Sequence, residues 1–107
     1  MRRPAEAEDA FRKAVAADPS RPEYRANLGL ALFFRRDLAG AEETLRAGLA
    51  AHPDHARTRN ALAAVLTEKG SYDEAERLFR ESLTVDPGDA SARAGLQVLE
   101  QRRAAVR

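Results

Sequence analysis

The sequence predicts an all-α protein built as a stack of helix pairs, because a 34-residue repeat runs through most of the chain. Three prolines lie 34 residues apart, and each follows an alanine by 12 residues and a large apolar residue by eight. These residues are Pro19, Pro53 and Pro87; Ala7, Ala41 and Ala75; and Phe11, Leu45 and Phe79. A fixed period of about 20–50 residues is typical of solenoids, in which each repeat packs only against its neighbours. No segment alternates apolar and polar residues as a β-strand does.

The composition excludes several classes of protein. A chain of 107 residues is long enough for one small domain. Its 18 basic and 17 acidic residues give almost no net charge, which argues against a nucleic-acid partner. Without cysteine, disulfides and thiolate chemistry are excluded. No apolar run approaches the roughly 18 residues of a membrane helix, and no secretory signal is recognisable at the start, so we expect a cytoplasmic protein without a membrane partner.

Setting the chain out at the 34-residue period gives four units. Residues 4–20 are predicted to form only the second helix of a unit. Residues 22–55 and 56–89 each predict two helices, because their apolar residues recur at helical spacing. Residues 90–107 predict a final first helix that caps the stack. The expected total is six helices in a single domain that spans residues 1–107.

Several residues are predicted to begin or end these helices. Ser71 and Glu74 have the spacing of a capping box, and Gly70 is predicted to end the helix before them. The carboxylates predicted to cap other helices are Asp37, Asp54 and Asp89. Each repeated proline is predicted to stop a helix, because it disfavours helical geometry in the residue before it.

Small residues are predicted where helices cross closely. The three repeated alanines would let the axes approach, with Gly29 and Ala63 as small partners on the first helices. The three large apolar residues would then fill the space between repeats. Gly48 replaces the alanine expected near the end of its helix, so we expect it to loosen that segment.

This pattern resembles the tetratricopeptide repeat family, whose unit carries Trp-x2-Leu-Gly-x2-Tyr, then Ala-x3-Phe, then Pro. The matching residues are Leu28, Gly29, Leu32, Ala41, Leu45 and Pro53 in one unit; Leu62, Ala63, Leu66, Ala75, Phe79 and Pro87 in the next; and Ala7, Phe11 and Pro19 at the start. The resemblance covers nearly the whole chain. It implies a right-handed superhelix of antiparallel helix pairs that serves as a non-enzymatic protein-interaction scaffold.

The chain departs from the family pattern at two kinds of position. Arg25, Arg59 and Arg93 occupy the tryptophan position of each unit. We expect each to be a solvated side chain with a local carboxylate; the alternative is a ladder of arginines that contacts an acidic partner. In the last unit Glu100 stands where the family has an aromatic residue, which is typical of a solvating cap helix.

The resemblance also implies a concave groove lined by the first helices of successive units. The residues expected to bind a peptide or partner protein there are Asn27, Leu30, Phe34, Arg57, Asn60, Ala64, Val98 and Arg102. Asn27, Arg57 and Asn60 would bond the backbone or carboxylates of the partner. Phe33 and Phe34 point about 100° apart on a helix, so one is expected to pack and the other to be exposed. The exposed ring is a candidate anchor, and ordinary packing at a repeat boundary is the alternative.

Some members of the family hold chaperone C-termini in a clamp of Lys, Asn and Arg side chains. Asn27 matches one of these asparagines and Arg57 stands at a clamp lysine, but Ala61 replaces the clamp arginine. The helix that would supply the first lysine and asparagine of the clamp is missing. The clamp is therefore incomplete, and the sequence does not predict binding of chaperone tails.

Catalytic, cofactor and metal sites are not predicted. His52 and His55 flank one of the prolines, but two histidines and a carboxylate in a turn make a poor metal site. Paired charges such as Glu42–Arg46, Glu76–Arg80 and Arg77–Glu81 have the spacing of ordinary helix ion pairs. Two further hypotheses stay open beside the scaffold. The incomplete first unit exposes Phe11, which would allow a weak homodimer through open helical ends, and the chain could be a fragment of a larger multidomain protein.

Overall fold

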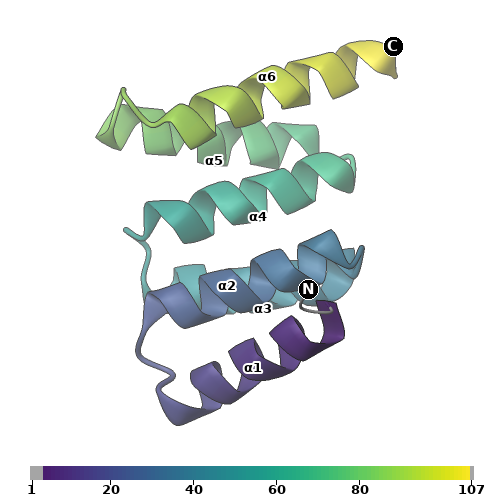
Figure 1. Cartoon of the computed structure of the whole chain (residues 1–107). Coiled ribbons are helices and arrows are strands. Elements are labelled where there is room, and N and C mark those ends of the chain that lie inside the picture. Colours follow the sequence, from purple (N-terminus) through teal and green to yellow (C-terminus); the bar gives the residue numbers. More distant parts are fainter. Residues whose placement is uncertain (1–3, 107) are drawn as a thin grey trace.

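The computed structural model describes residues 4–106 and contains six α-helices, with no β-strand among these residues (Figure 1). This confirms the all-α prediction and the expected number of helices. The helices are α1 (Pro4–Ala17), α2 (Pro22–Phe34), α3 (Leu38–Ala51), α4 (Ala56–Glu68), α5 (Tyr72–Val85) and α6 (Ala90–Ala105).

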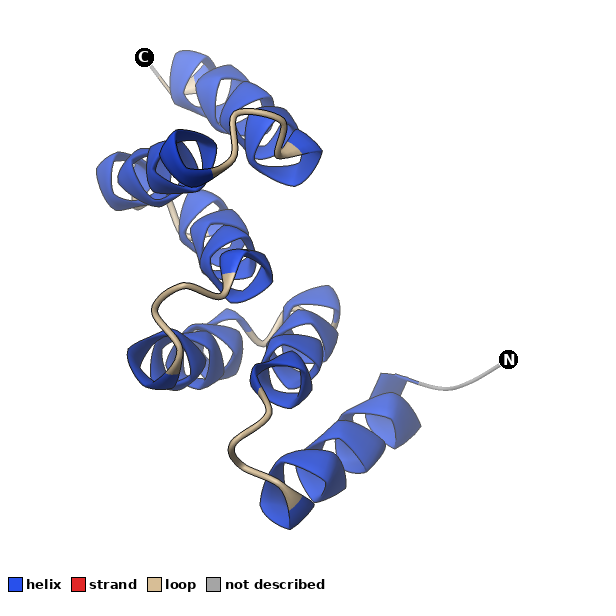
Figure 2. Ribbon diagram, turned by 90° about the vertical axis from the view of Figure 1, so that its left-hand side faces the viewer, coloured by secondary structure: helices blue, strands red, loops and turns tan. Residues whose placement is uncertain are grey.

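The helices stack in chain order into an elongated molecule of 41 × 27 × 23 Å. Each helix packs on the next along the chain, and α4 also contacts both α2 and α6. Figure 2 views the helices nearly end-on and shows them following one another in a zigzag from the N-terminal to the C-terminal end. The helices α2, α4 and α6 therefore form a row of their own, which faces the viewer in Figure 1.

The core sits where the repeat places its small and large apolar residues. Ala41 and Ala75 are completely buried, as are Leu45 and Phe79 to within 2%. The need for a small residue opposite them is direct. A methyl group added at Gly29 would lie 2.4 Å from the Leu45 side chain, a separation that packed atoms do not adopt. Gly29 thus has the predicted role of close-packing partner.

Helices α2 and α4 end in the same way, one repeat apart. Arg36 and Gly70 both have positive φ, at 68° and 85°. The next residues, Asp37 and Ser71, donate their backbone N–H groups to the carbonyls of Leu32 and Leu66. This is the Schellman pattern of helix termination, and it confirms that Gly70 ends its helix. Arginine tolerates the left-handed backbone less well than glycine.

The predicted helix caps are partly confirmed. Asp37 accepts a hydrogen bond from the Gly40 N–H and Asp89 from the Ala92 N–H. The prediction for Asp54 is wrong by one residue, because His55 caps α4 through Nδ1.

The capping box is also wrong. Ser71 makes no side-chain capping bond, and Glu74 binds Arg46 on the neighbouring unit instead. The expected loosening at Gly48 leaves no break, since α3 continues through this buried glycine. Only 3.3 Å would separate an added methyl group at Gly48 from Arg25 Cβ.

The three arginines at the tryptophan positions share a contact that the sequence analysis missed. Each guanidinium donates to the carbonyl of the proline six residues earlier: Arg25 to Pro19 at 2.9 Å, Arg59 to Pro53 at 3.0 Å and Arg93 to Pro87 at 2.7 Å. Both expectations for these arginines, a solvated side chain with a local carboxylate or contact with an acidic partner, therefore need correction. Each arginine ties the start of a first helix to the turn that precedes it.

A second set of contacts, which we call the ionic ladder, also repeats every 34 residues. Each rung has a glutamate bound by the arginine four residues later and by a cation 27 residues later. The rungs are Glu8 with Arg12 and Arg35; Glu42 with Arg46 and Lys69; and Glu76 with Arg80 and Arg103. The predicted pairs Glu42–Arg46, Glu76–Arg80 and Arg77–Glu81 are confirmed. The third member of each rung joins one helix pair to the next.

Candidate functional site: the concave face

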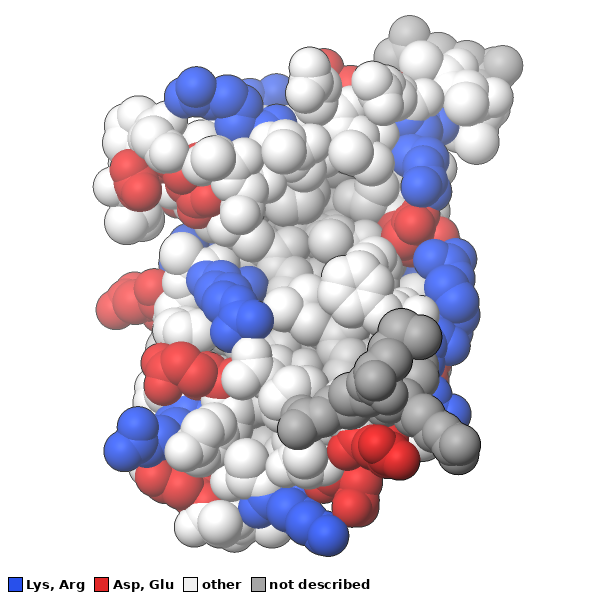
Figure 3. Space-filling view, viewed as in Figure 1, with Lys and Arg blue, Asp and Glu red and all other residues white. Residues whose placement is uncertain are grey.

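The candidate site lies on the row formed by α2, α4 and α6. Figure 3 shows this face with uncharged atoms running down its middle and most of the charged side chains at its margins. The face follows from the repeat, because successive first helices turn the same side outward while their opposite sides bury leucines such as Leu28, Leu62 and Leu99. Three adjoining hollows lie along it.

The largest hollow, of about 700 Å³, lies between α4 and α6. Its lining is partly apolar, with Leu30, Ala61 and Ala64, and partly polar, with Arg57 and Asn60. The turn before α6 closes one side and adds carboxylates. This mixture of surfaces accommodates a polypeptide better than it does a small apolar molecule.

A smaller hollow of about 190 Å³ continues from the first and shares Ala64, Phe79 and Gly95 with it. Phe33 and Val98 complete its apolar walls. Gly95 makes this depression possible, because a methyl group there would lie 2.3 Å from the Phe79 ring. The hollow has the size and character to take one apolar side chain of a ligand.

The third hollow, of about 360 Å³, lies between α1 and α2. Phe11, Asn27 and Phe34 line it, and it shares Leu30 and Arg57 with the largest hollow. Seven of the eight residues predicted to bind a partner therefore line a hollow of this face: Asn27, Leu30, Phe34, Arg57, Asn60, Ala64 and Val98.

The eighth predicted residue, Arg102, is held away from these hollows. Its guanidinium binds the carboxylate of Glu68, which is also paired with Arg36. The three side chains form a charged crosslink between α4, α6 and the end of α2. Arg102 thus stands at the margin of the face with its charge already compensated.

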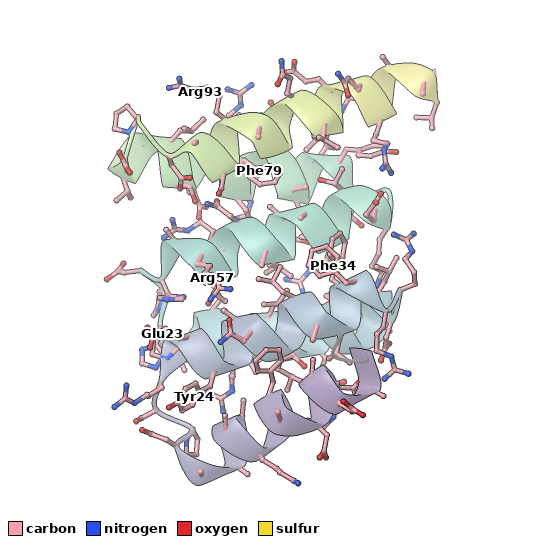
Figure 4. The ribbon with its side chains drawn as sticks, in the orientation of Figure 1. Glu23, Tyr24, Phe34, Arg57, Phe79 and Arg93 are labelled. Atoms are coloured by element: carbon pink, nitrogen blue, oxygen red, sulfur yellow. The ribbon has the colours of Figure 1, made fainter. Side chains whose placement is uncertain are left out.

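Phe33 and Phe34 divide as the sequence predicted. Phe33 packs on the core, whereas Phe34 is 77% exposed. Their ring centroids are 5.5 Å apart with the planes tilted by 59°. Figure 4 shows Phe34 at one end of α2 and Arg57 at the opposite end of α4, so an apolar and a cationic group stand apart on the same face.

Asn60 has a structural contact that sequence reasoning missed. Its Nδ2 donates to Asp89 Oδ2 at 2.9 Å, while Asp89 Oδ1 caps α6. The hydrogen bond from Asn60 lowers the pKa of the Asp89 carboxyl, because it favours the charged form. Asn60 Oδ1 is buried and has no hydrogen-bond partner among the described residues. Asn60 therefore fixes the start of α6 with one end of its amide.

Arg57 is the exposed cation within the face. It lines two of the three hollows, and no acidic side chain in residues 4–106 lies within ion-pairing distance of it. A guanidinium in this state has all its donors available for a carboxylate or for peptide carbonyls. Arg57 is thus the charged residue of the face best placed to bind a ligand.

The histidines flanking Pro53 serve the fold. His55 Nδ1 accepts the Thr58 N–H at 3.3 Å, and its Nε2 lies 3.6 Å from Glu23. Within residues 4–106 no group of three or more His, Cys, Asp or Glu side chains is placed to hold a metal ion. None of the described helices combines the length and apolar character needed to cross a bilayer.

Comparison with known proteins identifies the repeat. A sequence profile described as tetratricopeptide repeat matches residues 1–56 and again residues 27–92. A search of curated proteins gave no significant match.

Solved structures agree in fold. The first tetratricopeptide domain of human RPAP3 matches with a TM-score of 0.87 and 24% identity, over 95% of this chain and 80% of that one. The Arabidopsis OM64 domain matches with a TM-score of 0.83 and 16% identity, over 92% and 81% of the two chains. The second RPAP3 domain, solved in complex with an HSP70 peptide, matches with a TM-score of 0.81 and 20% identity, over 91% and 81%.

Proposed function

The chain belongs to the tetratricopeptide repeat family, and we propose that its concave face binds a segment of a partner protein. The family is generally a non-enzymatic protein-interaction fold. A structural neighbour was solved with a bound peptide, which supports a peptide ligand for this scaffold. We propose accordingly that the chain acts by binding and carries out no reaction of its own.

The observation that carries this proposal is the continuity of the three hollows along α2, α4 and α6. Shared residues connect them, and their walls alternate between apolar side chains and the exposed Arg57. A ligand that fits would place an apolar side chain beside Val98 and a carboxylate or carbonyl near Arg57. Phe34 would add an apolar contact at the far end.

The clamp for chaperone tails forms no part of this proposal. Ala61 stands where that clamp needs an arginine, and Asn60 is already bonded to Asp89. Arg102 is likewise neutralised by Glu68. The ligand is therefore expected to depend on apolar contacts and on Arg57 rather than on a free C-terminal carboxylate.

The test is selection of displayed random peptides on the intact chain, followed by affinity measurement with variants. Peptides that bind the groove should lose at least tenfold in affinity with Val98→Arg and with Arg57→Glu. The control is Arg77→Glu, which changes an exposed charge on α5 outside the row. Selected peptides that bind both groove variants as tightly as the wild type would contradict the proposal.

Self-association through the two ends is the second candidate. The partly exposed Phe11 of α1 favours it, while the polar outer side of α6 opposes it. Light scattering with size-exclusion chromatography, from micromolar to near-millimolar protein, separates the two functions. A concentration-dependent dimer that Phe11→Ser abolishes would promote this second candidate.

A further inference from the structure

The N-terminal edge of the stack leaves exposed a surface that the interior repeats bury. In α1, Ala7 and Phe11 stand at the positions of Ala41 and Leu45 in α3. Ala41 and Leu45 are completely buried, whereas Ala7 and Phe11 are only partly covered. The residue types are those of a buried interface, but one side of the interface is missing.

The interior of the molecule shows what covers such a surface. A shift of 34 residues carries Ala7, Phe11, Asn27 and Ala31, which line the 360 Å³ hollow, onto four residues that are at most 6% exposed. Those four are Ala41, Leu45, Ala61 and Val65. They lie on α3 and α4, the two helices that α2 contacts on the side away from α1. The occupant that this geometry accepts is therefore one α-helix, seated on α1 and alongside α2.

The same comparison defines the sequence that the helix must carry. Opposite Leu45, α2 presents Gly29 between the buried Leu28 and Leu32. One repeat later, α4 presents Ala63 between the buried Leu62 and Leu66. The helix that covers Phe11 thus needs a small residue preceded by a leucine and followed, three positions on, by another.

A second copy of this chain does not supply that helix. The corresponding residues of α6, the exposed first helix at the other end, are Leu96, Gln97 and Glu100. Gln97 would replace the small residue against Phe11, and Glu100 would bring a carboxylate into an apolar contact. Burying that charge without a partner costs more than the contact returns.

We propose that the edge formed by α1 and α2 is a docking site for an amphipathic helix of another polypeptide, with Leu-Gly/Ala-x-x-Leu on its apolar side. This site extends the row of first helices by one member and is separate from the groove that the row encloses. Its failure or success is independent of whether the groove binds a peptide.

The test uses the intact chain and a probe that has the required pattern by construction. The probe is a fluorescent peptide of residues 55–70, capped at both ends, which reproduces α4 with its Leu62, Ala63 and Leu66. We expect saturable binding by fluorescence anisotropy, and amide chemical-shift changes centred on Ala7 and Ala31. The same peptide with aspartate at both leucines is expected to bind at least tenfold more weakly.

Protein variants decide where the probe sits. Ala7→Arg should weaken binding at least tenfold, because it blocks the surface while arginine keeps α1 helical. Ala16→Arg is the matched control, since Ala16 lies on the exposed side of the same helix. Val98→Arg, which blocks the groove, should leave binding of this probe unchanged. No saturable binding, equal binding to Ala7→Arg, or loss of binding with Val98→Arg would each overturn the proposal.

Discussion

The two ends of the stack treat the same repeat positions in opposite ways. At the C-terminal end, α6 has Gln97 and Glu100 at positions that in α4 are the buried Ala63 and Leu66. At the N-terminal end, α1 keeps an alanine and a phenylalanine of interior type, although no helix covers them. The C-terminal end has thus adapted to solvent in its sequence, and the N-terminal end has not.

This difference teaches that the register of a repeat specifies the shape of a contact but not whether the contact is made. A terminal helix is soluble when its outer residues are polar, as α6 shows. Where the outer residues stay apolar, the surface has a use or a cost. Variants at equivalent positions along the stack measure which of the two applies.

The largest expected difference lies between two phenylalanines at the same repeat position. Phe79→Ala removes a ring that is 2% exposed and should lower the free energy of unfolding by about 3–5 kcal/mol. Phe11→Ala removes a partly exposed ring and should cost about 1–2 kcal/mol, because less apolar area returns to water. Urea unfolding followed by far-ultraviolet circular dichroism measures both. Equal losses would show that α1 is packed as tightly as the interior.

A second comparison sets an interior arginine against a terminal one. Arg59 is 5% exposed, and it bonds both Pro53 O and Ser82 Oγ at 3.0 Å. Arg59→Met keeps the aliphatic stem but leaves these acceptors unpaired, so we expect a loss of about 2–3 kcal/mol. Arg93→Met removes one exposed bond, to Pro87, and should cost less than about 1 kcal/mol.

The same urea titrations test this pair. The two arginines occupy one repeat position and bond a proline carbonyl in one way, so each variant serves as the control for the other. If Arg93→Met proved as damaging as Arg59→Met, the proline contact alone would account for the stabilisation. The additional burial of Arg59 would then contribute nothing.

The contrast between the ends can also be removed by design. Gln97→Ala combined with Glu100→Leu gives α6 the outer residues of α4, so α6 should dock on the α1 edge of a second copy. We expect self-association at least tenfold tighter than that of the wild type, or about 1.4 kcal/mol. Sedimentation at several concentrations measures it, and adding Ala7→Arg should reverse it. Association that persists with Ala7→Arg would show that the new contact lies elsewhere.

The repeat made the fold predictable from the sequence, because its signals are local or periodic. Alanines at a fixed period, a glycine at a helix end and the caps Asp37 and Asp89 all depend on residues within one unit. The prediction for Asp54 missed because histidine was not considered as a cap. Yet the cap positions of α2, α4 and α6, at Arg21, His55 and Asp89, follow the same 34-residue period.

The contacts that were missed connect residues of different units. Glu74 was expected to cap its own helix, but Arg46, 28 residues earlier, competes for it with two bonds of 2.9 Å. The bond from Asn60 to Asp89 spans 29 residues. Such pairs depend on the angle between successive helix pairs, which sequence spacing alone does not give. For the same reason the sequence predicted most of the residues on the face but not that Arg102 and Asn60 were already bound.

The smallest expected effect concerns the rungs of the ionic ladder, and it depends on pH. Lys69 and then Arg46 lower the pKa of the Glu42 carboxyl from its ordinary value of 4.5, and in Glu76 the corresponding shift comes first from Arg80. A carboxyl whose pKa is lower in the folded than in the unfolded chain stabilises the fold above the ordinary pKa. That stabilisation is lost as the pH falls through the folded pKa.

The interior rung is longer than the terminal ones, since Arg46 also holds Glu74. Glu42→Gln should therefore lower Tm by about 2–5 °C at pH 7, and Glu76→Gln should lower it less. At pH 3 the Tm of Glu42→Gln and of the wild type should converge, because the wild-type carboxyl is then largely protonated. Thermal unfolding at both pH values, in low salt, measures this. An equal deficit at pH 3 and pH 7 would mean that Glu42 stabilises the stack by packing, and that the ladder's charges contribute nothing in the interior that they lack at the ends.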